Sequence, residues 1–209
     1  MSEHGIPLWL RWAQEIQSLS QTGLMYATKG YDAQRYRRFM EISAEIVQNH
    51  TNLDKDQLLD TFLVQTGYAT PKIDVRGAVI RDGKILLVQE RADKRWCMPG
   101  GWADVGELPS QSIVREMREE SGFEVAPRKV IGIYDANRDG IPLEFYHAYK
   151  IVFLCEMLGG QARPSEETLA VAFFGFENLP PLSRFRTNDR HLAEIRAHLM
   201  EEIRPTAFD

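Results

Sequence analysis

The sequence has few cysteines and no long apolar run. Only two of its 209 residues are cysteine, Cys97 and Cys155, which is too few for a disulfide framework and is typical of a reducing compartment. The longest apolar run, residues 169–176, is eight residues long, whereas a membrane-spanning helix needs about 20. We therefore expect a cytoplasmic protein with no membrane partner.

A secretion signal and an excess of basic residues are also lacking. The first residues show no basic segment followed by an apolar stretch, so no secreted protein is predicted. The 25 Lys and Arg residues are outnumbered by 30 Asp and Glu residues, and no DNA partner is expected from this balance. The hydrophobic share of 44% is that of an ordinary globular protein. The length predicts one domain plus an attachment.

Residues 1–70 are predicted to form a small helical domain. Apolar residues recur at helical spacing in two stretches, and a third stretch follows Asp54, whose side chain could cap it. In the first stretch the apolar residues at this spacing are Leu8, Trp9, Trp12, Ile16 and Leu19. Short helices bury little surface alone, so this segment is expected to support the substrate site or to form a dimer interface. Dimers are the commonest soluble oligomers, and we expect a homodimer.

Residues 71–209 are predicted to form an α/β domain. Strand-like runs at residues 75–80 and 84–89 flank Asp82-Gly83, a strong signal for a two-residue hairpin. A glycine-rich loop precedes a helix predicted at residues 109–121. Further strands are predicted at residues 125–134, 145–156 and 169–176, a loop at residues 135–142, and a last helix at residues 188–203.

The helix at residues 109–121 carries three carboxylates on one face. Glu116, Glu119 and Glu120 are spaced i, i+3 and i+4, which places them within about 100° of arc. Such carboxylates repel one another unless a cation neutralises them, and hard oxygen ligands suit Mg²⁺ or Mn²⁺. A charged run is, however, usually only a solvated helix face. The spacing alone therefore does not distinguish a metal site from an exposed surface.

The segment around this helix resembles the Nudix box, G-x5-E-x7-R-E-U-x-E-E-x-G-U, in which U is a bulky apolar residue. Its fixed positions are all filled, by Gly101, Glu107, Arg115, Glu116, Met117, Glu119, Glu120, Gly122 and Phe123. A chance match arises on the order of once in 10⁷ chains of this length. The resemblance implies an α/β/α sandwich with a mixed sheet, preceded here by the helical domain.

The resemblance also implies a metal site and a reaction. Nudix proteins hydrolyse a nucleoside diphosphate linked to another moiety, so a small-molecule nucleotide substrate is implied. Glu116, Glu119 and Glu120 would bind Mg²⁺ or Mn²⁺ together with a backbone carbonyl near Gly100 or Gly101. Arg115 would hold Glu116 in place by a charge-assisted hydrogen bond.

Residues outside the box are predicted to complete the site. In the family the general base is either a box glutamate or an acidic residue on a distant loop. Glu166 and Glu167 precede a predicted strand, and we rank Glu167 first as a distal base, although both could be exposed loop charges. Arg76 and Arg91 are predicted to reach phosphates, and Trp102 is predicted to stack on a base.

The N-terminal segment narrows the substrate class. Residues 10–47 and 66–80 resemble the helical extension of a bacterial Nudix subgroup described as CDP-choline or ADP-ribose pyrophosphatases. We therefore expect a Mg²⁺-dependent hydrolase that cleaves the pyrophosphate bond of a nucleoside diphosphate linked to a small moiety, with CDP-choline favoured, which would give CMP and phosphocholine. The alternative is cleavage of ADP-ribose into AMP and ribose 5-phosphate.

Two further hypotheses share the fold but not this activity. One is a non-catalytic sensor in which a Nudix domain controls a DNA-binding module. Such a module should be basic, whereas the extension here is slightly acidic and the C-terminal tail is only one helix long. The other is hydrolysis of damaged nucleotides or RNA 5′ ends, which uses the same chemistry on another substrate.

Overall fold

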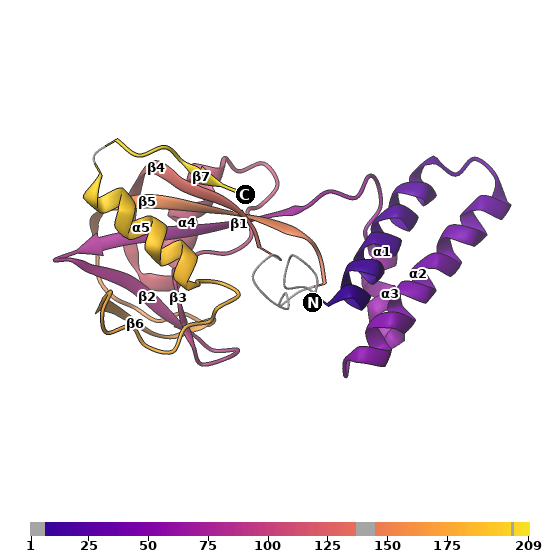
Figure 1. The fold of residues 1–209 in the computed structure, drawn as a ribbon, viewed down its shortest axis with the longest axis horizontal. Helices are drawn as coiled ribbons and strands as arrows, with labels where there is room; N and C mark the ends of the chain where they lie inside the picture. Colours follow the sequence, from indigo (N-terminus) through magenta and orange to yellow (C-terminus); the bar gives the residue numbers. More distant parts are fainter. Residues whose placement is uncertain (1–6, 137–144, 202) are drawn as a thin grey trace. The chain divides into compact units, whose positions relative to one another are not determined.

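The computed structural model describes residues 7–136, 145–201 and 203–209, which form two compact units (Figure 1). The first unit takes in Met1–Pro71 and Asn137–His147, of which residues 7–71 and 145–147 are described. The second unit takes in Lys72–Ala136 and Ala148–Asp209. Within the described ranges, no helix is long and apolar enough to cross a membrane.

The first unit contains the predicted helices, α1 (Leu8–Tyr26), α2 (Gly30–His50) and α3 (Lys55–Val64). Asp54 caps α3 as expected, because its Oδ1 accepts hydrogen bonds from the amides of Asp56 and Gln57 at 3.0 and 3.1 Å. The main cluster of buried apolar residues in this unit comes from all three helices: Ala13, Met40, Ala44, Val47, Leu58 and Phe62.

Three of the five apolar residues whose spacing predicted α1 lie on its exposed side. Leu8, Trp12 and Leu19 are 48, 53 and 63% exposed. The helix instead buries a face that includes Gln17 and Ser20, at 3 and 1% exposure. Small residues line the contact with α2, where the Ser43 hydroxyl donates a 2.7 Å hydrogen bond to the Ala13 carbonyl. Close approach of the two helices thus favours small and polar residues there, and leaves the large apolar side chains outside.

The second unit is built on a mixed sheet of seven strands, in the order β3-β2-β1-β5-β4-β7 with β6 paired to β2. The pairs β1–β5 and β4–β7 are parallel, and the other pairs are antiparallel. The strands are β1 (Lys72–Arg81), β2 (Lys84–Glu90), β3 (Trp96–Cys97), β4 (Phe123–Asp135), β5 (Ala148–Gly160), β6 (Thr168–Gly175) and β7 (Ala207–Phe208).

Two helices cover opposite faces of this sheet, α4 (Pro109–Ser121) and α5 (Asp189–Met200). Alternate residues of β1 point to the two sides, because successive side chains in a strand face opposite ways. Val75 packs with Met117 of α4, whereas Ala78 packs with Ile195 of α5. The α/β/α sandwich that the sequence predicted is therefore confirmed.

Several predicted boundaries need correction. The strand predicted from residue 145 begins at Ala148, because the Phe145 ring packs 4.8 Å from the Phe62 ring in the helical unit. The last helix ends at Met200, and its outer residue Leu199 is 45% exposed. A loop was predicted at residues 135–142. Its residues 137–142 lie outside the described ranges. The short strands β3 and β7 were not predicted.

Candidate active site

Helix α4 places the three candidate metal ligands at different depths. Pro109 begins the helix, where its missing N–H is tolerated. Gly122, with φ of 77°, ends it in the left-handed conformation. Glu116 and Glu120 are only 9 and 6% exposed, whereas 52% of the Glu119 side chain is exposed. One helix face thus runs from solvent into the protein.

Arg115 joins the start of the box to the helix. Its Nε donates to Glu107 at 3.0 Å, and its Nη1 donates to Glu116 at 2.7 Å and to Glu119 at 3.2 Å. Its Nη2 also donates to the Trp102 carbonyl at 3.3 Å. A planar guanidinium suits several carboxylates at once, so Arg115 orients Glu116 and Glu119 together.

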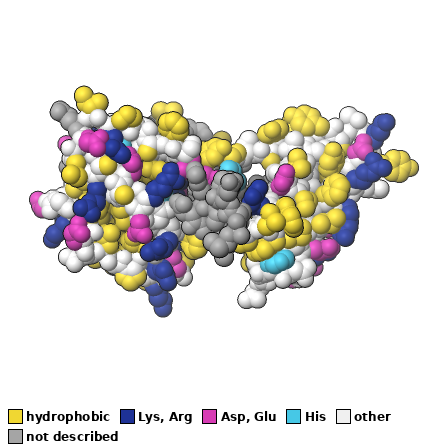
Figure 2. Space-filling model, viewed as in Figure 1, with side chains coloured by type: hydrophobic (Ala, Val, Ile, Leu, Met, Phe, Trp, Pro, Cys, Tyr) yellow, Lys and Arg dark blue, Asp and Glu magenta, His cyan; other side chains and the backbone are white. Residues whose placement is uncertain are grey.

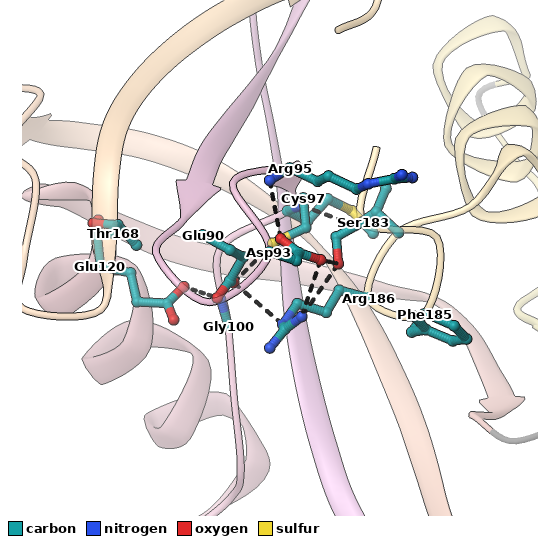
Figure 3. Close-up of polar contacts among 12 residues, drawn as sticks. Glu90, Asp93, Arg95, Cys97, Gly100, Glu120, Thr168, Ser183, Phe185 and Arg186 are labelled. Atoms are coloured by element: carbon teal, nitrogen blue, oxygen red, sulfur yellow. Dashed lines mark hydrogen bonds and ion pairs between the residues drawn. The ribbon is translucent and has the colours of Figure 1, made fainter. Parts of the chain in front are cut away.

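Glu120 is turned toward the loop before the helix, where its Oε2 accepts a 2.8 Å hydrogen bond from the Gly100 amide (Figure 3). Burial raises the pKa of Glu120 to about 8, although the Arg76 charge acts in the opposite direction. Burial also raises the pKa of Glu116, against the effect of Arg115. Two desolvated carboxylates would gain from added positive charge at this site.

The loop at residues 98–101 follows β1 closely. The carbonyl of Pro99 accepts from the Gly77 amide at 2.9 Å, and that of Gly101 accepts from the Val75 amide at 2.8 Å. Among the described residues, the Gly100 carbonyl has no hydrogen-bond donor. The predicted Gly101 carbonyl is therefore bonded within the fold, and the Gly100 carbonyl is the more available metal ligand of the two.

The donor set fits a hard divalent cation, although its members are not gathered in this structure. In the described part of the chain, no three His, Cys, Asp or Glu side chains lie close enough together to hold a metal ion. Arg115 holds two of the carboxylates, and the Gly100 amide holds Glu120. All candidate donors are oxygens, as Mg²⁺ requires. A Cβ at Gly101 would lie 3.0 Å from Glu116 Oε2, so the glycine leaves room for this carboxylate.

The segment that carries the predicted distal base is fastened beside α4. The Thr168 hydroxyl donates a 2.9 Å hydrogen bond to the Glu120 carbonyl, and Thr168 follows Glu167 directly in the chain. Arg91 binds the same segment, since its amide donates to the Glu167 carbonyl at 2.9 Å and its Nε to the Glu166 carbonyl at 2.8 Å. These contacts bring the segment of Glu166 and Glu167 to the carboxyl end of α4.

The carboxyl end of α4 is also closed by the residues that follow β5. The amide of Arg163 donates to the Ser121 carbonyl at 3.0 Å, and that of Gln161 donates to the Gly122 carbonyl at 3.3 Å. Carbonyls that the helix itself cannot satisfy are thereby bonded.

Arg76, expected to reach a phosphate, instead points into the protein. It is 6% exposed, its Nε donates to Asp74 at 3.0 Å, and its Nη1 donates to the Met98 carbonyl at 3.2 Å. These contacts use the guanidinium to support the loop at residues 98–101. Trp102, expected to stack on a base, lies at the edge of this loop and is 39% exposed.

Two buried polar contacts near the loop were not predicted. Lys150, only 1% exposed, lies 3.7 Å from Asp74 Oδ2. The Cys97 thiol donates a 3.0 Å hydrogen bond to Glu90, which also pairs with Arg186 at 3.3 Å (Figure 3). A sequence signal existed for Lys150, because it is a charged residue directly before five apolar residues of a predicted strand.

Comparison with known proteins agrees with this geometry. A family model described as the NUDIX domain matches residues 71–194, more than half of the chain. A second model, described as a UDP-X-like, N-terminal oligomerisation domain, matches residues 7–62.

Individual relatives cover nearly the whole chain. The chain is 38% identical to "Putative ADP-ribose pyrophosphatase YjhB" of Bacillus subtilis (strain 168), over 96% of this chain and 97% of that protein. The crystal structure of an ADP-ribose pyrophosphatase from Streptococcus suis 89-1591 is 37% identical, with a TM-score of 0.60 over 67% of this chain and all of that one. The crystal structure of a UDP-X diphosphatase is 28% identical, with a TM-score of 0.62 over 96% of this chain and 98% of that one. The box geometry and these matches together show that the chain belongs to the Nudix family and is a pyrophosphohydrolase.

Proposed function

We propose that this enzyme hydrolyses the pyrophosphate bridge of ADP-ribose into AMP and ribose 5-phosphate. The observation that carries the proposal is the similarity to YjhB over nearly the full length of both chains. The Streptococcus suis structure supports the same substrate. CDP-choline, which the resemblance of the N-terminal segment favoured, is retained as a comparison substrate because the box indicates a pyrophosphate bridge but not the group beyond it.

The proposed division of roles follows the contacts of the site. Glu116, Glu119 and Glu120 would hold Mg²⁺ or Mn²⁺ once Arg115 and the Gly100 amide yield some of their hydrogen bonds. A bound divalent cation would neutralise the charge on phosphate oxygens and lower the pKa of the attacking water.

Residues outside the helix would handle the proton and the substrate. Glu167 is the proposed base that accepts the proton of the attacking water, and the contacts of Arg91 and Thr168 keep its segment beside α4. Trp102 is the proposed contact to the base of the nucleotide, and Arg91 to its phosphates.

A substrate panel tests this proposal. We expect kcat/KM for ADP-ribose at saturating Mg²⁺ to exceed the values for CDP-choline, a UDP-sugar and ATP by about tenfold, a difference of about 1.4 kcal/mol in transition-state binding. Glu120→Gln protein, purified in parallel, measures contaminating activity. Preference for CDP-choline, or for the triphosphate, would contradict the proposed substrate while leaving the Nudix chemistry in place.

We also propose that the helical unit forms the interface of a homodimer. Leu8, Trp12, Leu19 and Tyr26 lie within about 40° of arc on α1, and they are 48–64% exposed. The opposite side of the helix buries Gln17. Figure 2 shows hydrophobic side chains over the surface of this unit. A helix with its apolar stripe outside is typical of an interface, and the matching family model is described as an oligomerisation domain.

We propose a reducing, cytoplasmic location because neither cysteine forms a disulfide. Cys97 and Cys155 are both free and buried. Two buried thiols that form no disulfide suit a reducing compartment.

A further inference from the structure

The turn at residues 183–187, which precedes α5, is fastened to the connection between β2 and β3. The Ser183 hydroxyl donates a 2.6 Å hydrogen bond to Asp93. The Arg186 guanidinium pairs with buried Glu90 at 3.3 Å, and Figure 3 shows both contacts on one side of the turn. The turn is therefore fixed from this side by two side chains.

Lys150 fixes the same turn from the sheet. Its Nζ donates to the carbonyls of Phe185 and Arg186 at 2.6 and 2.9 Å, and Asp74 lies 3.7 Å away. A buried ammonium is costly unless its donors are bonded. Here its three N–H groups have three oxygen neighbours, two of them backbone carbonyls of one turn. The charged side chain of Lys150 thus holds the backbone of the turn at residues 183–187 in place.

Thr187 connects this turn to the loop before α4. It is fully buried, and its Oγ1 accepts a 2.8 Å hydrogen bond from the Met98 amide. The Met98 carbonyl is held on its other side by Arg76. Two residues later, the Gly100 amide reaches Glu120. A continuous set of hydrogen bonds thus links the turn to a metal-ligand carboxylate.

We propose that Thr187 and Lys150 are positioning residues for the metal site. Lys150 fixes the turn, Thr187 fixes the Met98 peptide, and the loop at residues 98–101 is thereby held where Gly100 meets Glu120. The inference rests on the proposed metal-dependent function. Neither side chain is a metal ligand, so their effect on metal affinity passes through the loop.

Mn²⁺ binding without substrate tests the role of Thr187. Thr187→Val has nearly the same shape but no acceptor for the Met98 amide, and we expect its dissociation constant for Mn²⁺, from electron paramagnetic resonance of free Mn²⁺, to rise about tenfold. Thr187→Ser keeps the hydroxyl and should restore wild-type affinity. Thr206→Val is the matched control, because it loses a similar hydroxyl bond, to the Val130 carbonyl, away from the loop.

A double-mutant cycle tests the link to Lys150. If Lys150 acts through Thr187, Lys150→Met should weaken Mn²⁺ binding alone but add little in the Thr187→Val background, because coupled residues are not additive. All measurements are made below the onset of thermal unfolding of each variant. If Lys150→Met does not fold, the comparison of Thr187→Val with Thr187→Ser still decides the role of Thr187.

The outcomes separate this inference from the proposed function. Wild-type Mn²⁺ affinity in folded Thr187→Val would overturn the inference, even if the variant unfolds at a lower temperature. Additive losses in the cycle would overturn the link between the two residues. Wild-type protein whose Mn²⁺ binding is absent, or unchanged in Glu120→Gln, would instead contradict the metal-dependent function.

Discussion

The amide of Gly100 donates a 2.8 Å hydrogen bond to the carboxylate of Glu120. Gly100 lies in the loop directly before Gly101, the first residue of the box, and Glu120 lies in α4. Gly100 has φ of 139°, a conformation that other residues rarely adopt. The position of a carboxylate proposed to bind the metal therefore depends on a backbone conformation that favours glycine.

Replacing this glycine should destabilise the protein. In Gly100→Ala the new Cβ would lie 2.0 Å from the Val75 carbonyl oxygen, in a backbone conformation that is already strained for alanine. We expect the free energy of unfolding in urea to fall by about 1–3 kcal/mol, together with weaker Mn²⁺ binding. Gly175→Ala, where nothing lies within 4 Å of the new Cβ, is the control. Equal stability of the two variants would contradict the steric argument.

Neutralising Glu120 should abolish turnover without unfolding the protein. Glu120→Gln keeps the size of the side chain but gives a poor ligand for Mg²⁺, and we expect kcat to fall by about 100-fold or more. EDTA should have the same effect on the wild type, reversed by added Mg²⁺. Glu177→Gln, on an exposed residue that pairs with Arg196, serves as the control. Full turnover in EDTA would exclude the metal mechanism.

The helix that carries this site was predictable because local signals and packing agree there. Pro109 and Gly122 mark its ends, and the predicted bounds match α4. The hairpin at Asp82-Gly83 was predictable for the same reason, since both residues have positive φ, 52° and 71°, as a type I′ turn requires.

His191 should make the fold sensitive to acid. Burial, reinforced by the Lys150 charge, lowers its pKa to about 2. Below about pH 6.5 the unfolded chain therefore binds a proton that the folded protein does not, and the free energy of unfolding should fall by up to about 1.4 kcal/mol per pH unit. In His191→Gln this contribution should disappear, while an acceptor for the Asn188 amide remains, as in a capping box.

Urea unfolding of both proteins from pH 7.5 to 5.0 measures the effect. The comparison at pH 7.5, where the histidine is neutral in both states, isolates any packing difference. Parallel pH profiles of wild type and variant would show that His191 is not responsible.

Charges on the exposed stripe of α1 should dissociate the proposed dimer. Trp12→Glu combined with Leu19→Glu places two carboxylates in the apolar stripe, where burial would cost several kcal/mol. Light scattering should then give the monomer mass of 24.0 kDa. Val64→Glu, at an 82% exposed position of α3, is the control and should keep the wild-type mass. A wild type that is itself monomeric at micromolar concentration would contradict the dimer.

The parts that escaped prediction depend on contacts between distant residues. The strand β3 has only two residues, and its pairing with β2 comes from neighbouring backbone rather than from an apolar pattern. Thr187 has no periodic context, so its bond to Met98, 89 residues away in sequence, could not be inferred. The surface that the outward stripe of α1 meets could not be inferred either, because periodicity alone does not tell a core from an interface.

The residues after β5 are hydrogen-bonded to the carboxyl end of α4, so exposure of their amides to solvent is coupled to the end of that helix. The amide of Arg163 lies outside any helix or strand, yet its hydrogen bond ends on the Ser121 carbonyl. Solvent can reach this amide only when the last turn of α4 separates from it, and that turn carries Glu120. Hydrogen exchange at Arg163 therefore follows the free energy of separating this loop from the end of α4, so a loop amide reports how firmly the two segments are held together beside Glu120.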